Sequence, residues 1–308
     1  MLPSVALCAW PDRPIKIIVP YAPGAAGDVL IRYMQAVMQE RLGQPLVIEN
    51  KSGAGGNIGT QEVVRSKADG YTFVLGATNN FVINQFVYKN MGFNPLDTLS
   101  PVTKLISVPP VIFVNASVPS GSYAEFVRYA KANDGKLNYG SPGPGTTPHF
   151  SAWALSEATG TKMTHVPFKG SPPGVQALMA NEVQVFLVGY GVAAGQLTTG
   201  RIKALAVAHH ERLLGAPDLP TTKEVGVPNV ILSNWWGLAT AKGTDPAVIS
   251  RIAAEFKRVL DLPATQSFLI RQGFVSVGNS PEQFARELVG EAQEWQMIVN
   301  KAGTKLDE

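Results

Sequence analysis

Three apolar, strand-like segments of this chain each run directly into a glycine-rich loop that opens a helical pattern. Ile17-Ile18-Val19 leads into residues 23–28, Leu46-Val47-Ile48 into residues 53–59, and Leu137-Asn138-Tyr139 into residues 140–147. Glycine has no side chain to block a ligand and tolerates positive φ, while the N–H groups and positive dipole end of the following helix attract negative charge. The pattern predicts an α/β protein that binds an anion largely through its backbone.

Length and charge narrow the class of protein further. The 308 residues are enough for about two domains of ordinary size. The 26 basic and 23 acidic residues leave a net charge of +3 and are interspersed, without the charge runs typical of nucleic-acid or membrane-surface binding. Beyond the first ten residues, no stretch is long and apolar enough to span a bilayer. We therefore expect a soluble body and no nucleic-acid partner.

The first ten residues are apolar and small, and end just before Pro11-Asp12-Arg13-Pro14. This pattern is typical of the tail of an export signal, although a basic n-region and a full apolar core are missing. An unstructured start is the alternative. Cys8 is the only cysteine, so no internal disulfide is possible. We expect an exported protein in which residues 1–10 are the remnant of a signal peptide.

Short strands alternate with helical patterns almost throughout the chain, which predicts βα units around two mostly parallel sheets. The first helix is expected to stop at Gly43, a glycine C-cap, and its apolar stripe comprises Leu30, Met34, Val37, Met38 and Leu42. Later helix starts are marked by capping-box spacing or by a cap followed by proline, at Ser122 with Glu125, Thr221 with Glu224, Ser280 with Gln283, and Asp245-Pro246.

Two extended apolar segments with helix-incompatible residues predict where the chain crosses between domains. They are residues 108–111 and residues 228–233. Domain 1 would then comprise residues 11–108 and 233–308, and domain 2 residues 109–232. Two crossings of this kind place a cleft between the domains.

The motifs of common nucleotide-binding and hydrolytic enzymes are missing from the sequence. The third glycine of residues 53–59 falls one position late for G-x-G-x-x-G, and residues 77–80 hold no acidic partner for a ribose. Neither a G-x-x-x-x-G-K-[ST] phosphate loop nor a G-x-S-x-G nucleophile elbow occurs. We expect no cofactor.

The four histidines have no recognised metal spacing, so we expect no metal site. His149 follows the third glycine loop and has either a ligand-binding or a loop-stabilising role. His165 lies in a predicted strand, where a hydrogen-bonded core histidine is favoured, and His209-His210 is expected to face solvent.

Polar residues within the loops also have two interpretations each. Asp28 could cap the first helix, or it could compete with a bound anion or align a bridging water or a ligand amine. Ser141, Thr146 and Thr147 offer hydroxyls to a carboxylate, but they serve equally well as helix caps.

Taken with Asp69-Gly70-Tyr71 and residues 165–170, these loops resemble the Bug-type receptors of tripartite tricarboxylate transporters. The resemblance runs from Trp10 to Gly303, and its further motifs are Asn57-Ile58-Gly59, Tyr139-Gly140-Ser141, Leu219-Pro220-Thr221 and Trp236-Gly237-Leu238. It implies a two-domain, Venus-flytrap-like periplasmic binding protein, expected to be a monomer. Such a protein hands small organic acids to membrane permease subunits and holds one carboxylate by main-chain N–H groups and ordered waters.

The resemblance also implies which residues line the pocket. Domain 1 would contribute Tyr21, Gly24, Ala25, Asp28, Gly55, Gly56, Asn57 and Asn79. Domain 2 would contribute Ser141, Thr146, Thr147, His149, Lys169 and Gly189. Lys169 is the best candidate for holding a second carboxylate, and a purely structural role for it is equally open.

The sequence departs from the family pattern at two places. The first loop has Ala25-Ala26 where glycine is usual, and Leu187-Val188-Gly189 replaces the familiar Phe-Asp-Asn. If Val188 faces the pocket, an apolar wall replaces a carboxylate, and amino acids are expected to bind poorly because their ammonium group loses its partner. A core residue at the end of a strand is the alternative interpretation of Val188.

We therefore expect a receptor for a dicarboxylate or an aromatic carboxylate, without enzymatic activity. An α/β enzyme acting on a small anion is the alternative from another class, but no acid–base pair or oriented nucleophile is evident. A sensory receptor that reports ligand occupancy to a membrane kinase would use the same pocket.

Overall fold

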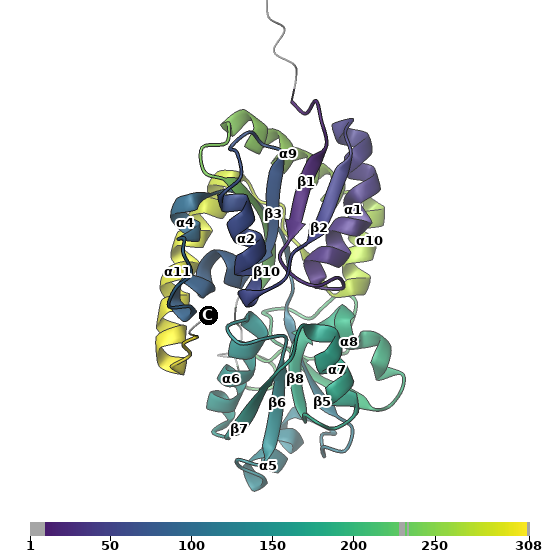
Figure 1. Ribbon diagram of the computed structural model, residues 1–308. Coiled ribbons are helices and arrows are strands. Elements are labelled where there is room, and N and C mark those ends of the chain that lie inside the picture. The colour runs from purple at the N-terminus through teal and green to yellow at the C-terminus, as the bar shows by residue number, and fades with distance from the viewer. Residues whose placement is uncertain (1–9, 228–231, 233, 307–308) are drawn as a thin grey trace, which may run out of the picture.

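The structure is a computed structural model that describes residues 10–227, 232 and 234–306. It consists of two lobes, each built around one β-sheet with helices on both faces (Figure 1). The predicted signal remnant, including Cys8, lies outside the described residues apart from Trp10. The predicted α/β class with two sheets is confirmed.

The first lobe holds a six-stranded sheet in the order β11-β4-β10-β3-β1-β2. Its strands are β1 (Ile15–Val19), β2 (Leu46–Asn50), β3 (Thr72–Ala77), β4 (Leu99–Ser107), β10 (Trp235–Ala241) and β11 (Val275–Ser276). Its longer helices are α1 (Ala26–Leu42), α2 (Asn57–Val64), α9 (Pro246–Leu260), α10 (Pro263–Gln272) and α11 (Pro281–Ala302). Shorter helical pieces are η1 (Ala54–Gly56), the π-helical turn η2 (Asn79–Ile83), α3 (Asn84–Val87) and α4 (Pro95–Thr98).

The second lobe holds a five-stranded sheet in the order β7-β6-β8-β5-β9. Its strands are β5 (Pro110–Asn115), β6 (Leu137–Ser141), β7 (Met163–Pro167), β8 (Val185–Gly189) and β9 (Ile202–Val207). Its helices are α5 (Tyr123–Ala132), α6 (Thr147–Thr159), α7 (Ser171–Met179) and α8 (Tyr190–Leu197).

Both sheets are mixed rather than mostly parallel as predicted, because the strand that follows each crossing, β10 in the first sheet and β5 in the second, runs against its neighbours. The βα units supply the parallel pairs β2-β1-β3 and β7-β6-β8. The strands β10 and β4 of the first sheet, and β5 and β9 of the second, pair antiparallel. Each sheet therefore has a parallel half, and the three glycine loops follow strands of those halves.

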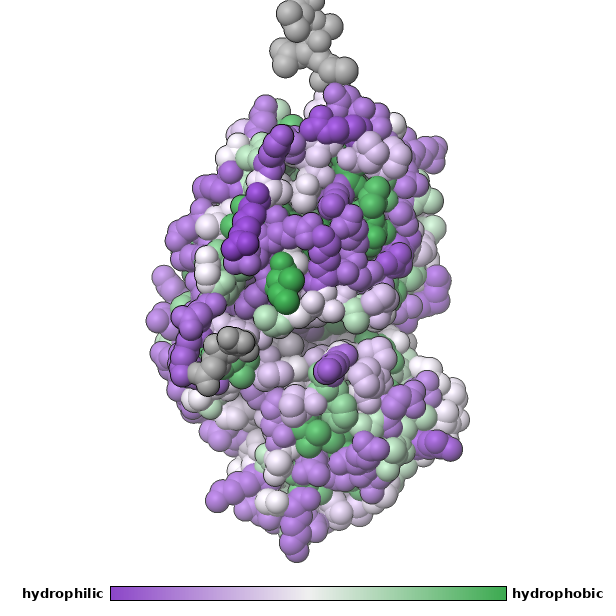
Figure 2. Space-filling model, in the orientation of Figure 1, coloured by the Kyte–Doolittle hydropathy of each residue, from purple (hydrophilic) through white to green (hydrophobic). Residues whose placement is uncertain are grey.

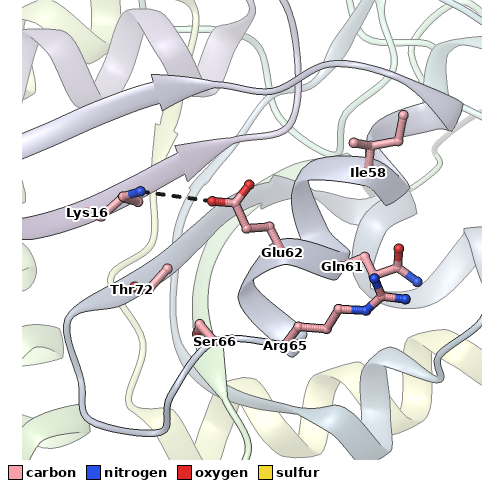
Figure 3. A pocket seen from close by; sticks show the side chains of 7 residues that line it. All are labelled: Lys16, Ile58, Gln61, Glu62, Arg65, Ser66 and Thr72. Atoms are coloured by element: carbon pink, nitrogen blue, oxygen red, sulfur yellow. Dashed lines mark ion pairs between the residues drawn. The ribbon is translucent and has the colours of Figure 1, made fainter.

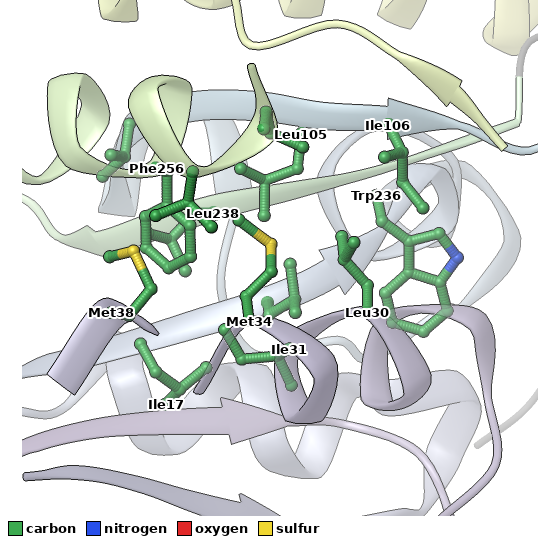
Figure 4. Packing of buried hydrophobic residues seen from close by; sticks show 14 of the residues in the cluster. Ile17, Leu30, Ile31, Met34, Met38, Leu105, Ile106, Trp236, Leu238 and Phe256 are labelled. Carbon is green, nitrogen blue, oxygen red and sulfur yellow. The ribbon is translucent and has the colours of Figure 1, made fainter. Parts of the chain in front are cut away.

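Both faces of the first sheet are buried, so successive side chains of a strand pack into hydrophobic clusters on opposite faces. Ile15, Ile17 and Val19 of β1 join the cluster under α1 and α9, while Ile18 joins the cluster on the opposite face. The predicted stripe of α1 packs into the first cluster, where Leu30, Met34 and Met38 are fully buried against residues such as Leu238 and Phe256 (Figure 4).

The predicted helix ends are largely confirmed. Gly43 closes α1 with a φ of 68°, where a side chain would be strained. Ser122 and Asp245 cap α5 and α9, and Ser280 with Gln283 forms a complete capping box. Thr221 and Glu224 exchange the same pair of bonds around a turn rather than an α-helix.

The two crossings between lobes are hydrogen-bonded to each other. The N–H of Val108 donates to the carbonyl of Asn234 at 2.7 Å, and the Asn234 amide donates back to the carbonyl of Val108 at 2.7 Å. Most of the second predicted crossing, residues 228–231 and 233, lies outside the described residues. The paired segments join the two lobes, between which Figure 2 shows a hollow.

Candidate ligand-binding site

Six helical segments begin where a parallel strand ends, and the turns that join them border the hollow between the lobes. In the first lobe β1, β2 and β3 lead into α1, η1 and η2, and in the second lobe β6, β7 and β8 lead into α6, α7 and α8 (Figure 1). The two sets of turns approach each other closely. A β-carbon placed on Gly24 would lie 3.9 Å from Pro172, and one on Gly145 would lie 3.2 Å from Val87.

This arrangement directs positive helix ends at one space. The first N–H groups of a helix have no partner within it, so a helix start favours a bound anion. The three glycine loops contain no arginine. The site can therefore hold a carboxylate with backbone donors and without an arginine from these loops.

Asp28 is the third residue of α1, and Ala25, not Asp28, is the N-cap. The buried carboxylate of Asp28 accepts hydrogen bonds from the N–H of Gly24 at 3.0 Å, from Arg32 Nε at 2.9 Å and from Asn50 Nδ2 at 2.9 Å. The capping interpretation is thus wrong in position, although the side chain does satisfy a backbone donor of the first loop. Arg32 balances the charge of Asp28 within the protein.

The second loop is fixed by a cluster of asparagines that follows β3. The carbonyl of Gly55 accepts hydrogen bonds from the side-chain amides of Asn79, Asn80 and Asn84 at 2.8, 3.0 and 3.1 Å. Asn84 Nδ2 also donates to Asn57 Oδ1 at 2.6 Å. Asn57 and Asn79, both predicted site residues, are therefore brought together. The structure adds Asn80 and Asn84, whose only sequence signal was a repeated asparagine in an otherwise apolar segment.

Tyr21 ties the first loop to the same cluster. Its hydroxyl lies 2.7 Å from Asn79 Oδ1 and 2.8 Å from Asn80 Oδ1. Burial raises the pKa of Tyr21 above its ordinary value, so the hydroxyl keeps its proton. Its ring packs edge-on against Trp236, with the ring centroids 5.1 Å apart.

The third loop rests on a stack of aromatic rings in which two are histidines. The ring centroids of His149 and His165 are 4.1 Å apart, and Tyr139 stacks on His165 at 5.0 Å. His165 Nε2 lies 2.6 Å from Ser141 Oγ, and the N–H of Gly145 donates to His149 Nδ1 at 3.3 Å. His149 thus stabilises the loop, which is one of its two predicted roles, and His165 is hydrogen-bonded, as predicted.

Both imidazoles are held neutral by their surroundings. Burial, followed by the nearby His165, lowers the pKa of His149 to about 3, and burial lowers the pKa of His165 to about 4. The wall of the second lobe therefore offers hydrogen-bonding groups without a positive charge from histidine at neutral pH.

The two threonines at the start of α6 differ in their partners. Thr146 is the N-cap residue, and its hydroxyl donates to the carbonyl of Gly143 at 2.7 Å. The Thr147 hydroxyl is buried and has no hydrogen-bond partner in the structure. An unpaired buried hydroxyl is costly, so Thr147 has the capacity for one further polar contact.

The remaining predicted residues of the second lobe lie in contrasting environments. Lys169 is exposed on the turn between β7 and α7 and forms no ion pair with the described residues. Val188 is 3% exposed and belongs to a hydrophobic cluster with Val175. Gly189 is the N-cap of α8 and lies against the first crossing, where a β-carbon would lie 2.5 Å from Val108. The ligand-binding roles of these three residues stay predictions.

A separate hollow of about 530 Å³ lies on the outer side of the first lobe, between β1, β3 and α2 (Figure 3). Of its charged lining residues, Lys16 lies 4.0 Å from Glu62 and also 3.0 Å from Glu49 of β2. No helix start described above opens into it, and the Glu62 carboxylate would repel an anion bound beside Lys16. The hollow between the lobes is the better anion site.

Residues 10–227 and 234–306 contain no helix that combines the length and apolar character of a membrane span. The same part of the chain gathers no cluster of histidine, cysteine, aspartate or glutamate arranged to hold a metal ion.

Residues 30–304 match the model of the family described as the tripartite tricarboxylate transporter family receptor. The chain is similar to BugT of Bordetella pertussis, with 30% identity over 303 residues that cover 98% of this chain and 93% of BugT.

Solved structures with bound acids have the same fold as this chain. Rpa4515 of R. palustris with adipate superposes with a TM-score of 0.91 at 31% identity, covering 96% of this chain and 100% of that one. MatC of Rhodopseudomonas palustris with bound malate gives a TM-score of 0.86 at 28% identity, covering 94% and 100%.

Proposed function

The chain belongs to the receptor family of the tripartite tricarboxylate transporters, and from that premise we propose that it binds a small dicarboxylate or aromatic carboxylate outside the cytoplasm. Receptors of this family bind solutes and are not enzymes, which confirms the predicted absence of catalysis. We further propose that the bound acid passes to the membrane permease subunits of such a transporter, and that the protein acts as a periplasmic monomer.

The convergence of six helix starts on one space supports this proposal most strongly. Backbone donors at these turns suit a carboxylate, and the neutral histidine wall leaves the rest of the ligand in an uncharged setting. The adipate and malate bound by Rpa4515 and MatC are both dicarboxylates. Exposed Lys169, on the turn between β7 and α7, is our candidate for the second carboxylate.

We propose that residues 11–108 with 233–308 and residues 109–232 move as two bodies that close on the acid. The paired crossings at Val108 and Asn234 are a suitable hinge, because a hinge confines backbone rotation to a few residues.

Calorimetry with adipate, malate and benzoate, combined with product analysis by NMR, tests the binding proposal. We expect saturable binding of at least one acid and no change in the acid after prolonged incubation. Turnover would favour the enzyme alternative, and failure of every acid to bind would contradict the proposal.

Two further measurements test its finer parts. The matched pair succinate and aspartate, which differ only by an α-amino group, should show weaker binding of aspartate if Val188 gives the pocket an apolar wall. Deletion of the gene should abolish uptake of the bound acid, whereas unchanged uptake with a lost transcriptional response would favour a sensory role.

A further inference from the structure

We propose that residues 304–306, here called the C-terminal strap, position the third glycine loop against the first lobe and so slow the release of ligand. This inference rests on the proposed function for its link to ligand release. The strap follows α11, whose C-terminal part lies beside α6 of the second lobe (Figure 1).

Backbone hydrogen bonds hold the strap on the first lobe. The N–H of Leu306 donates to the carbonyl of Val87 at 2.9 Å, and the N–H of Lys89 donates to the carbonyl of Leu306 at 3.1 Å, so that Tyr88 and Leu306 form a parallel β-bridge. Lys305 Nζ adds a bond to the carbonyl of Phe86 at 2.7 Å. These bonds attach the strap to residues 86–89, at the end of α3.

The bridge lies directly against the third loop of the other lobe. A β-carbon on Gly145 would lie 3.2 Å from Val87 Cγ1 and 3.9 Å from Leu306 Cδ1, so both side chains approach the Gly145 backbone. Gly145 has a φ of +76° and donates its N–H to His149 Nδ1. The strap therefore approaches the loop at Gly145, the glycine that joins the loop to the histidine stack.

The other end of the bridge reaches the second loop. A β-carbon on Gly55 would lie 2.6 Å from the hydroxyl of Tyr88, and the Gly55 carbonyl is the acceptor shared by the asparagine cluster. Residues 87–88 thus contact the second and third glycine loops at once. Securing this segment with the strap fixes the spacing between two of the proposed ligand loops.

The helix that leads into the strap is also joined to the second lobe. Phe150 of α6 is fully buried in a core cluster of the first lobe and packs edge-on against Trp295 of α11, with ring centroids 5.5 Å apart. Because α6 begins at the third loop, its contact with α11 also holds this loop against the first lobe, as the strap does. Opening of the cleft must separate these contacts before the third loop can leave the first lobe.

Hydrogen exchange on the full chain tests the strap independently of any ligand. Leu306→Ala and a chain ending at Gly303 are compared with the wild type and with Leu214→Ala, a control that removes an exposed leucine far from the strap. We expect amide exchange in residues 140–147 to speed up by about tenfold in both strap variants, with exchange in β8 unchanged. If the shortened chain does not fold, Leu306→Ala alone decides the result.

Stopped-flow dissociation of adipate or malate tests the consequence for release. We expect the dissociation rate to rise by about tenfold in Leu306→Ala and to stay at the wild-type value in Leu214→Ala. Unchanged exchange in residues 140–147, or an unchanged dissociation rate in folded Leu306→Ala, would overturn the proposal. If neither acid binds the wild type, the proposed function fails while the exchange measurement still decides whether the strap holds the loop.

Discussion

His149 and His165 stack in a wall of the site that takes up no proton near neutral pH. Their pKa values, about 3 and about 4, lie below the ordinary value of 6.5, so between these limits the unfolded chain binds more protons than the folded one. The contribution of these two histidines to the free energy of unfolding is therefore greatest above pH 6.5 and falls as the pH drops toward 4. Each histidine contributes a slope of up to about 1.4 kcal/mol per pH unit.

Urea unfolding at pH 7, 5 and 4 measures this loss. His149→Asn keeps an acceptor for the Gly145 N–H but does not titrate, so we expect a shallower decline than in the wild type. His210→Asn, in an exposed loop, should leave the decline unchanged. Equal slopes in all three proteins would show that the histidine stack does not govern acid stability.

Gly56, which the resemblance places in the pocket, is also constrained by the protein itself. Its φ is +92°, and a β-carbon would lie 2.3 Å from Asn80 Nδ2. Gly56→Ala should lower the free energy of unfolding by more than the roughly 1–2 kcal/mol expected from a left-handed conformation alone. Gly135→Ala is the control, since Gly135 has a φ of +76° and open space around it. Equal losses of stability in the two variants would contradict a role for the Asn80 contact.

Among the elements, the π-helical turn η2 organises the second loop. A π turn joins residues five apart, which places Asn79 above Asn84, and Asn79 Nδ2 donates to Asn84 Oδ1 at 3.2 Å. Asn84→Leu would remove one donor from Gly55 and leave the buried Asn57 oxygen unpaired. We expect a loss of about 1–3 kcal/mol in the free energy of unfolding, with weaker acid binding by calorimetry. A folded variant with wild-type stability and affinity would exclude the cluster from the site.

Elements set by neighbouring residues were predictable from the sequence, and those set by distant ones were not. The strands before each glycine loop, the stripe of α1 and the cap at Ser280 depend on local spacing, and all are confirmed. The antiparallel half of each sheet depends on the path that the chain takes between the two lobes. The bond from Asn84 to Gly55 spans 29 positions. No local pattern marks either feature, nor the bridge between Leu306 and Tyr88.

For the molecule as a whole, the fluorescence of Trp235 and Trp236 can report whether the lobes move when a ligand binds. Trp235 is 1% exposed, and its indole N–H donates to Glu291 within the first lobe at 2.6 Å. Trp236 instead contacts Tyr21, and a β-carbon on Gly27 of the first loop would lie 2.0 Å from its ring. If ligand closes the lobes, Trp236→Phe should remove most of a ligand-dependent fluorescence change, and Trp235→Phe should retain it. A signal insensitive to both substitutions would refute this assignment.

The convergence of helix starts on the cleft also has a consequence for the medium in which the protein works. Dissolved ions screen exposed charges over about 10 Å at 0.1 M salt, but they act far less on dipoles buried beside a ligand. Affinity for a carboxylate held mainly by backbone N–H groups should therefore change less than about threefold between 20 mM and 500 mM sodium chloride. Calorimetry at the two concentrations checks this, and a loss of tenfold or more would instead indicate attraction by surface cations such as Lys169. A receptor of this design would capture its acid about equally well in dilute and in saline surroundings.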